Sequence, residues 1–315
     1  MLVSCLCGKS FAQQKDFESV VYYTAEVKSK AAGVSDKDMM TMIGMGDRET
    51  VYIKQGNYRQ VSGFTEVYYI SKKEKVYYKF KKIDTLFYLD YSFDTSNVIS
   101  VSKTDDLKSI AGYECKSITI ASTSGTSKYF YAPLLHMNPE YDRNNTIGNF
   151  NIYTKETGSI MLGYHNETGI YALTETCTRV EPKAVDETVF DLPKLPEQKF
   201  TVESIKKPAE FKRGGEAGWI KYLQANINTS LGPKYIKIPK GEKDATETVQ
   251  LSFIISETGE VTDIKVLNKE EVHSKLAEEA VRVVKESYGW KPGTMYGEKI
   301  SFMMKQGITF QVTKQ

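Results

Sequence analysis

The C-terminal third of the chain changes its hydrophobic period three times. Apolar residues at helical spacing lie in 219–227 and again in 276–284. Between them, every second residue from Val249 to Ile255 is apolar, 257–259 predicts a turn, and Ile264 and Val266 continue on a return strand. Five apolar residues at even positions from Phe302 to Val312 predict a last strand, with Gly307 as a bulge. The predicted order is helix, strand, strand, helix, strand.

The chain before this region has the pattern of an antiparallel sheet. Short, tyrosine-rich strands follow one another, glycine turns separate several of them, and no helical repeats intervene. Tyrosine suits a half-exposed sheet surface because its ring packs while its hydroxyl reaches water. The expected strands are 20–29, 50–54, 67–70, 76–80, 86–91, 98–103, 115–120, 128–131, 159–164 and 170–179.

These two patterns predict an α+β protein of two domains. A chain of 315 residues is long for one core. A run containing Pro193 and Pro196 ends at Pro208 and predicts a semi-extended linker. We therefore expect a curved antiparallel sheet over 17–195, a linker over 196–207, and an αββαβ domain with a three-stranded antiparallel sheet over 208–315.

A methionine-rich segment interrupts the strand pattern between Ser35 and Gly46. Ser35 is placed as the cap of a short helix. The methionines are Met39, Met40, Met42 and Met45. Such a flexible cluster could be a lid over an apolar cavity, or it could be ordinary core that closes one end of the sheet.

Charge and targeting signals favour an exported protein that does not bind nucleic acid. Residues 205–315 carry only a small excess of basic over acidic residues, without a clustered arginine stripe. Residues 1–12 resemble a signal peptide that ends in Ser10-Phe11-Ala12, while Cys5 also fits a lipobox and would be acylated. No later stretch has the length and apolarity of a spanning helix. We expect a periplasmic protein, soluble or anchored to a membrane.

Two cysteines, Cys115 and Cys177, remain once the leader is set aside. Both lie in strand-like segments. An even number in an exported chain predicts a disulfide, because such bonds persist in oxidising compartments. The alternative is two buried thiols that pack as small hydrophobic side chains.

No arrangement of residues predicts catalysis, a metal site or a cofactor. The three histidines, His136, His165 and His273, have no metal-ligand spacing between them, and no nucleophile elbow or phosphate-binding glycine loop is found. Glu278 and Glu279 fall on the polar side of the second helix, where a solvated face is expected. We expect a binding protein rather than an enzyme.

The C-terminal pattern resembles the C-terminal domain of TonB. The resemblance rests on Pro208-Ala209-Glu210-Phe211, on Gly214-Gly215 before the first helix, and on Trp290-Lys291-Pro292-Gly293 before the last strand. It implies that a short peptide from an outer-membrane transporter or another envelope protein adds as a strand to the edge formed by 299–312. The side chains flanking that peptide would be Ser301, Met303, Lys305 and Thr309.

Two departures from TonB limit what the resemblance implies. Leu231-Gly232-Pro233-Lys234-Tyr235 and a lysine-rich stretch stand where the family commonly has a Tyr-Pro element. No inner-membrane helix or long proline-rich spacer is found before the domain. We therefore expect partner binding in the periplasm, without energy transduction.

The N-terminal region resembles GLPGLI-type exported proteins of Bacteroidota. Ile110-Ala111-Gly112-Tyr113-Glu114-Cys115-Lys116 and 185–193 carry this resemblance. That group is similar to the LolA and LolB lipoprotein carriers, whose curved sheet surrounds an apolar cavity. The resemblance implies an alternative function, in which the first domain carries a lipid or a lipoprotein.

Overall fold

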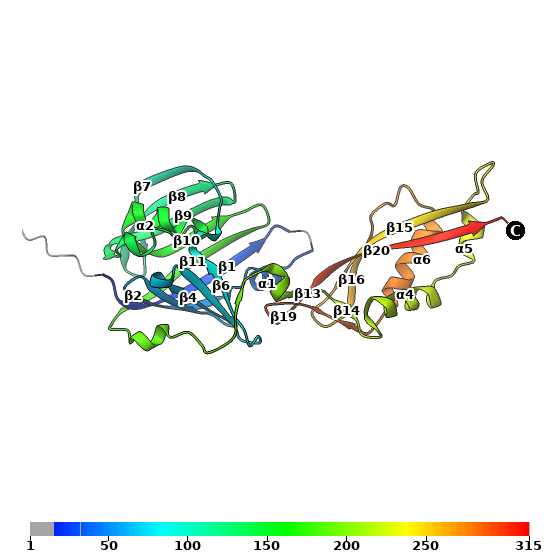
Figure 1. The fold of residues 1–315 in the computed structure, drawn as a ribbon. Helices are drawn as coiled ribbons and strands as arrows, with labels where there is room; N and C mark the ends of the chain where they lie inside the picture. Colours follow the sequence, from blue (N-terminus) through cyan, green and yellow to red (C-terminus); the bar gives the residue numbers. More distant parts are fainter. Residues whose placement is uncertain (1–15, 32, 315) are drawn as a thin grey trace, which may run out of the picture. The chain divides into compact units, whose positions relative to one another are not determined.

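The computed structural model describes residues 16–31 and 33–314, which divide into two compact units (Figure 1). The first comprises the chain up to Lys28 together with Met45–Lys199, and the second comprises Ser29–Gly44 together with the chain from Phe200 onward. The predicted leader at 1–12, with Cys5, lies outside the described residues. The predicted fold class is confirmed: the first unit is built on a large curved open sheet and the second on a small three-stranded antiparallel sheet.

One sheet of twelve strands forms the first unit in the described residues, in the order β12-β6-β5-β4-β3-β2-β1-β11-β10-β9-β8-β7. The strands are β1 (Ser19–Ser29), β2 (Arg48–Lys54), β3 (Asn57–Val61), β4 (Thr65–Ile70), β5 (Lys75–Phe80), β6 (Leu86–Asp90), β7 (Val98–Ile110), β8 (Tyr113–Ser122), β9 (Gly125–His136), β10 (Ser159–Glu167), β11 (Tyr171–Pro182) and β12 (Glu197–Lys199). Short 3-10 turns cover Ser71–Lys73, Tyr91–Phe93, Pro139–Tyr141, Ile147–Asn149 and Glu187–Phe190.

A helix that the sequence did not predict, α2 (Phe150–Thr157), packs against this sheet. Its Tyr153 is fully buried, and the ring lies 4.4 Å from the ring of Tyr129 on β9. Ile118 and Ile120 of β8 belong to the same cluster. Aromatic side chains thus form the contact between helix and sheet, because their large rings bury much apolar area at one position.

The segment expected to be a linker, 196–207, contains ordered elements. Glu197–Lys199 forms β12, which pairs parallel with β6 and extends the sheet of the first unit. Thr201 caps α3 (Val202–Ile205) in the second unit, and β13 (Lys206–Lys207) pairs with β18. Regular structure in this segment is short, but backbone hydrogen bonds hold both of its ends: β12 bonds to β6, and β13 bonds to β18.

The second unit contains the predicted αββαβ order with short additional elements. The helices are α1 (Asp36–Met42), α3, α4 (Gly215–Asn226), α5 (Leu231–Tyr235) and α6 (Ser274–Lys285). The strands are β13, β14 (Glu210–Phe211), β15 (Asp244–Ile255), β16 (Val261–Val266), β17 (Trp290–Lys291), β18 (Gly293–Met295), β19 (Glu298–Ile300) and β20 (Phe302–Thr313). The central sheet has the order β16-β15-β20.

The inner face of this sheet packs against α4 and α6. The odd-numbered residues of β15 from Val249 to Ile255 are buried, as alternation requires. Trp219 of α4 lies 4.9 Å from Trp290, ring to ring, above Phe253. On α6, Leu276, Ala280, Val283 and Val284 are fully buried. The apolar faces of the two helices and of the sheet therefore pack into one core.

The predicted bulge at Gly307 is wrong. The pairing of β15 with β20 is continuous from Asp244 opposite Thr313 to Ile255 opposite Phe302. Gly307 faces Gln250, whose side chain fills the space beside it. The irregularity lies instead between β15 and β16, where Asp263 has a φ of 48°.

Candidate functional site

The candidate site is the free edge of β20. This strand pairs with β15 on one side, and in the described residues no strand pairs with its other side. The burial alternates: Ile308 and Phe310 face the core, while Met303, Lys305 and Thr309 are exposed. The inner face thus anchors the strand and leaves its edge accessible.

The hydrogen-bond alternation of β20 fixes which backbone groups point outward. Lys314 donates its N–H to the carbonyl of Lys243 at 2.9 Å, so that residue pair exchanges its hydrogen bonds. In an antiparallel pair such residues alternate with residues whose N–H and C=O both point away. The odd-numbered residues from Met303 to Thr313 therefore present both groups to the free edge. On the other side of β15, the Gln250 carbonyl accepts from Leu267 N–H, which agrees with this register.

Neighbouring elements limit the free edge at both ends. At its start, Ser301 lies outside β20, and its N–H donates to Asp38 Oδ1 of α1 at 3.4 Å. At its far end, α5 contacts β20, and a Cβ added at Gly232 would lie 2.7 Å from the Gln311 carbonyl oxygen. The accessible stretch is therefore Met303 to Thr309, about 20 Å of extended chain. Within the described chain, no hydrogen bond occupies its outward N–H groups, whereas the outward carbonyl of Gly307 accepts one from the Gln306 side chain at 2.6 Å.

Three of the four expected flanking side chains lie on the outer face of the sheet beside this stretch. Met303 and Lys305 line a hollow of about 250 Å³, together with residues of β15 and β16. Asp263 and Lys265 add charges of both signs to it. Thr309 lies further along, with its hydroxyl 2.9 Å from that of Thr248. Only Ser301 departs from the expectation, since it precedes the strand.

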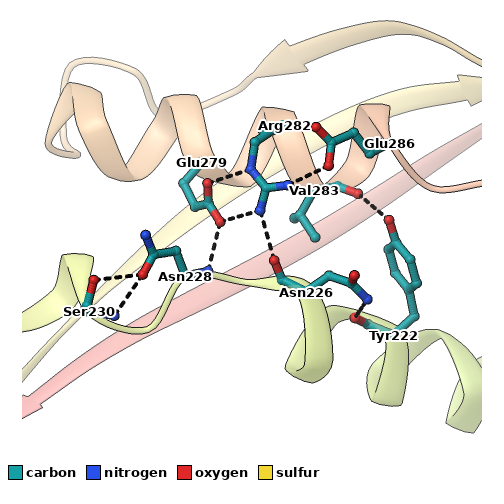
Figure 2. Close-up of polar contacts among 8 residues, drawn as sticks. All are labelled: Tyr222, Asn226, Asn228, Ser230, Glu279, Arg282, Val283 and Glu286. Atoms are coloured by element: carbon teal, nitrogen blue, oxygen red, sulfur yellow. Dashed lines mark hydrogen bonds and ion pairs between the residues drawn. The ribbon is translucent and has the colours of Figure 1, made fainter.

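A polar network fixes the chain between α4 and α5 against α6 (Figure 2). Glu279 accepts two hydrogen bonds from Arg282, at 2.8 and 2.6 Å, and one from the Asn228 N–H at 2.7 Å. Arg282 also donates to the Asn226 carbonyl at 2.8 Å. The Asn228 side chain then accepts from Ser230, the residue before α5. The network thereby positions α5, which closes one end of the free edge.

The environment of Glu279 differs from the solvated one expected from the sequence. Its side chain is buried, whereas that of Glu278 is exposed and pairs with Lys275. Hydrogen bonding to Arg282 lowers the pKa of Glu279 and outweighs the opposing effect of burial. The helical spacing put both glutamates on the polar side of α6. The chain at 226–230, however, covers Glu279 and leaves Glu278 exposed.

The methionine cluster does not line the apolar cavity of the first unit whose walls include Tyr23, Tyr58 and Phe150. Met39, Met40 and Met42 lie on α1, which begins after Ser35 as predicted but belongs to the second unit, and none of the four methionines borders the cavity of the first unit. The Tyr296 hydroxyl donates to the Met42 carbonyl at 3.1 Å. The sequence pattern predicted the helix, but it did not indicate which core the helix packs against.

The structure holds Cys115 and Cys177 as free, buried thiols, so the expected disulfide is absent from it. They lie on β8 and β11, which are separated in the sheet by β9 and β10. Both belong to one apolar cluster and pack as small hydrophobic side chains. Burial raises the pKa of both thiols, that of Cys177 to about 11.

Two buried glutamates of the first unit were not identified from the sequence. Glu49 of β2 and Glu175 of β11 are 4% and 6% exposed. Glu49 lines an apolar cavity of about 120 Å³. The signal was present in the alternation, because Glu49 is in phase with Val51 and Ile53, and Glu175 is in phase with Leu173 and Cys177, all inward-facing positions.

The histidines have local roles. His273 caps α6 by accepting from the Lys275 N–H, and His165 contacts Thr174 and Glu167 on its own hairpin. Among residues 16–31 and 33–314, no three His, Cys, Asp or Glu side chains are grouped as metal ligands would be. In the same residues, no helix has the length and apolarity needed to cross a bilayer.

The fold and the edge define a class: a small α+β domain whose last strand is unpaired on one side. Residues 242–312 match the family model described as Gram-negative bacterial TonB protein C-terminal. The matched range extends from just before β15 to the end of β20. Residues 242–312 therefore match a TonB-type C-terminal domain, and they lie within the range for which the sequence predicted one.

Solved structures give weaker likenesses. Two structures of PNGF-II match with TM-scores of 0.36 and 0.35 and identities of 11% and 10%, over 76% and 75% of this chain and 43% and 42% of PNGF-II. A crystal structure of MucB matches with a TM-score of 0.27 and 5% identity, over 61% of each chain. The chain thus spans less than two thirds of each of these proteins, and at such scores nothing about function follows. No curated protein matches the chain.

Proposed function

We propose that the second unit binds an extended peptide, which adds as a fourth strand to the free edge of β20. The observation that carries this proposal is the row of outward N–H and C=O groups from Met303 to Thr309. Main-chain hydrogen bonds would supply the affinity, and the hollow beside Met303 and Lys305 would receive a peptide side chain.

The TonB-type match supports a partner in the cell envelope. We propose that the partner is a peptide of an outer-membrane transporter or of another envelope protein, and that the chain works in the periplasm, free or anchored through Cys5. We propose a binding role without catalysis, on the ground that the sequence contains none of the catalytic motifs considered.

Proline at an outward position tests this proposal. Thr309→Pro removes one N–H that points to the free edge but no hydrogen bond to β15, so the domain should fold and the affinity for a transporter-derived peptide should fall. Thr309→Ala removes the side chain and keeps the donor, so it should bind nearly as the parent does. Calorimetry measures both. Equal losses in the two variants would place recognition on side chains and contradict strand addition.

A lipid carrier is the alternative function, and the cavity of the first unit bears on it. Its volume of about 120 Å³ is close to that of an engineered cavity of about 150 Å³ that binds benzene. A site of that size suits a small group rather than a whole acyl chain. Native mass spectrometry of the purified chain tests the carrier, because a co-purifying lipid would support it.

A further inference from the structure

The cavity of the first unit has aromatic and aliphatic walls with one acidic side chain among them. Tyr23, Tyr58, Tyr69 and Phe150 supply the rings, while Glu49 is the acidic residue. No lysine, arginine or histidine is among its lining residues. A site of this composition is suited to a cation, because ring faces and a carboxylate both attract positive charge.

Glu49 does not stand alone at the wall. It lies on β2, Glu175 lies on β11, and β1 runs between these two strands in the sheet. Gln60 donates its amide to Glu49 Oε2, whereas Oε1 meets no donor within the described chain. The charge of Glu175 acts on Glu49 and raises its pKa, so the two carboxyl groups are neighbours in the sheet. A buried acid pair without a basic partner is costly, and a bound cation would offset that cost.

The protonation of the pair supports the same conclusion. Burial, and then the charge of Glu175, raise the pKa of Glu49 to about 9, and burial raises the pKa of Glu175. Near neutral pH Glu49 therefore retains its proton. A ligand cation can take the place of that proton.

We propose that this cavity binds a small primary alkylammonium ion, with its nitrogen at the carboxyl group of Glu49 and its alkyl chain against the aromatic rings. The ammonium ion enters as R–NH₃⁺ and the proton of Glu49 leaves to solvent, so the charge of the site is unchanged. The cavity volume limits the alkyl group to a few carbons. The proposal is independent of peptide binding by the second unit.

Two sources have this chemistry: a free amine, and the aminobutyl arm of a lysine in a peptide. n-Butylammonium chloride represents the first, and Nα-acetyl-lysine amide represents the second. Whichever of them binds more tightly identifies the source. Failure of both would overturn the proposal.

Calorimetry on the full chain tests the site. n-Butylammonium should bind with release of close to one proton, seen by repeating the titration in buffers of different ionisation enthalpy. n-Butanol, which has similar size without the charge, should bind about ten- to hundredfold more weakly. Equal binding of the two, or binding without proton release, would overturn the proposal.

Variants separate the acid pair from the rest of the protein. Glu49→Gln with Glu175→Gln should abolish the preference for the amine over the alcohol, and removal of buried charges does not threaten folding. Glu26→Gln, at an exposed position on β1, is the matched control and should bind as the parent does. Equal losses in both variants would contradict a role for the pair.

The affinity should also rise between pH 6 and pH 8, because release of the Glu49 proton becomes easier. Tyr23, Tyr58 and Tyr69 stay neutral in this range, since burial raises their pKa values further. Asp142 accepts a hydrogen bond from Asn145, and burial raises its pKa to about 7, so it titrates in the same window. The pH dependence is therefore read as the difference between the parent and the double variant. No difference would overturn the proposal.

Discussion

Glu278 and Glu279 are adjacent on α6 and have opposite environments. Glu279→Gln removes a charged acceptor from Arg282 and from the Asn228 N–H, so it should lower the free energy of unfolding at pH 7 by about 1–3 kcal/mol. Glu278→Gln breaks only an exposed pair with Lys275 and should cost less than about 1 kcal/mol. Urea unfolding measures both.

The pH dependence of the Glu279 effect has a definite sign. Because the folded-state pKa is lowered, the carboxylate contributes stability above the ordinary glutamate pKa of about 4.3, and this contribution is lost as the pH falls through the folded-state value. The difference between the parent and Glu279→Gln should therefore shrink in acid. A difference that is constant from pH 7 to pH 3 would contradict the assignment.

Phe253 is the residue that most directly tests the core of the second unit. Its ring is 1% exposed and contacts the rings of Trp219 and Trp290. Phe253→Ala should lower the free energy of unfolding by about 3–5 kcal/mol. Ile220→Ala, on the exposed side of α4, should change it by about 0.5 kcal/mol or less. Similar effects of the two substitutions would contradict the assigned core.

The cysteines give a prediction about reactivity. Since Cys115 and Cys177 are buried and their thiol pKa values are raised, neither should react with iodoacetamide in the native protein, and both should react after denaturation without a reductant. Mass mapping of the two cysteine-containing peptides checks this. A disulfide-linked pair of these peptides would contradict the free thiols and support the disulfide predicted from the sequence.

At the scale of elements, α5 sets the length of the free edge. Gly232→Ala places a Cβ against the Gln311 carbonyl, so we expect a loss of about 1–3 kcal/mol although alanine favours a helix. Gly307→Ala meets only side chains at ordinary contact distance and should be neutral or slightly stabilising. If Gly232→Ala were as stable as the parent, α5 would not lie tightly against β20.

Elements with a strong hydrophobic periodicity could be predicted from the sequence, whereas elements that depend on tertiary contacts could not. The alternation in 249–255 and the helical spacing in 276–284 predicted β15 and α6, because each buries one continuous apolar face. The helix α2 was missed, since it depends on Tyr153 packing into the sheet. The limits of the edge were missed for a similar reason: Asp38 and Gly232 act there through contacts distant in sequence.

At the scale of the whole molecule, the chain consists of two compact units, and the second contains the inserted segment Ser29–Gly44. The Ile205 carbonyl accepts from the Tyr296 N–H, so an independently folding fragment should begin at Phe200 rather than at Ile205. We expect the fragment 200–315 to give dispersed amide resonances and a cooperative melt. A fragment without either would contradict independent folding of residues 200–315.

Amide hydrogen exchange along β20 tests strand addition most directly. In the free protein, the even-numbered amides bonded to β15 should be protected, while those of Met303, Lys305, Gly307 and Thr309 should exchange fast. On addition of a transporter-derived peptide, these four amides should become protected and those of β16 should not change. Binding that leaves the four amides fast, or that protects β16 instead, would contradict the account.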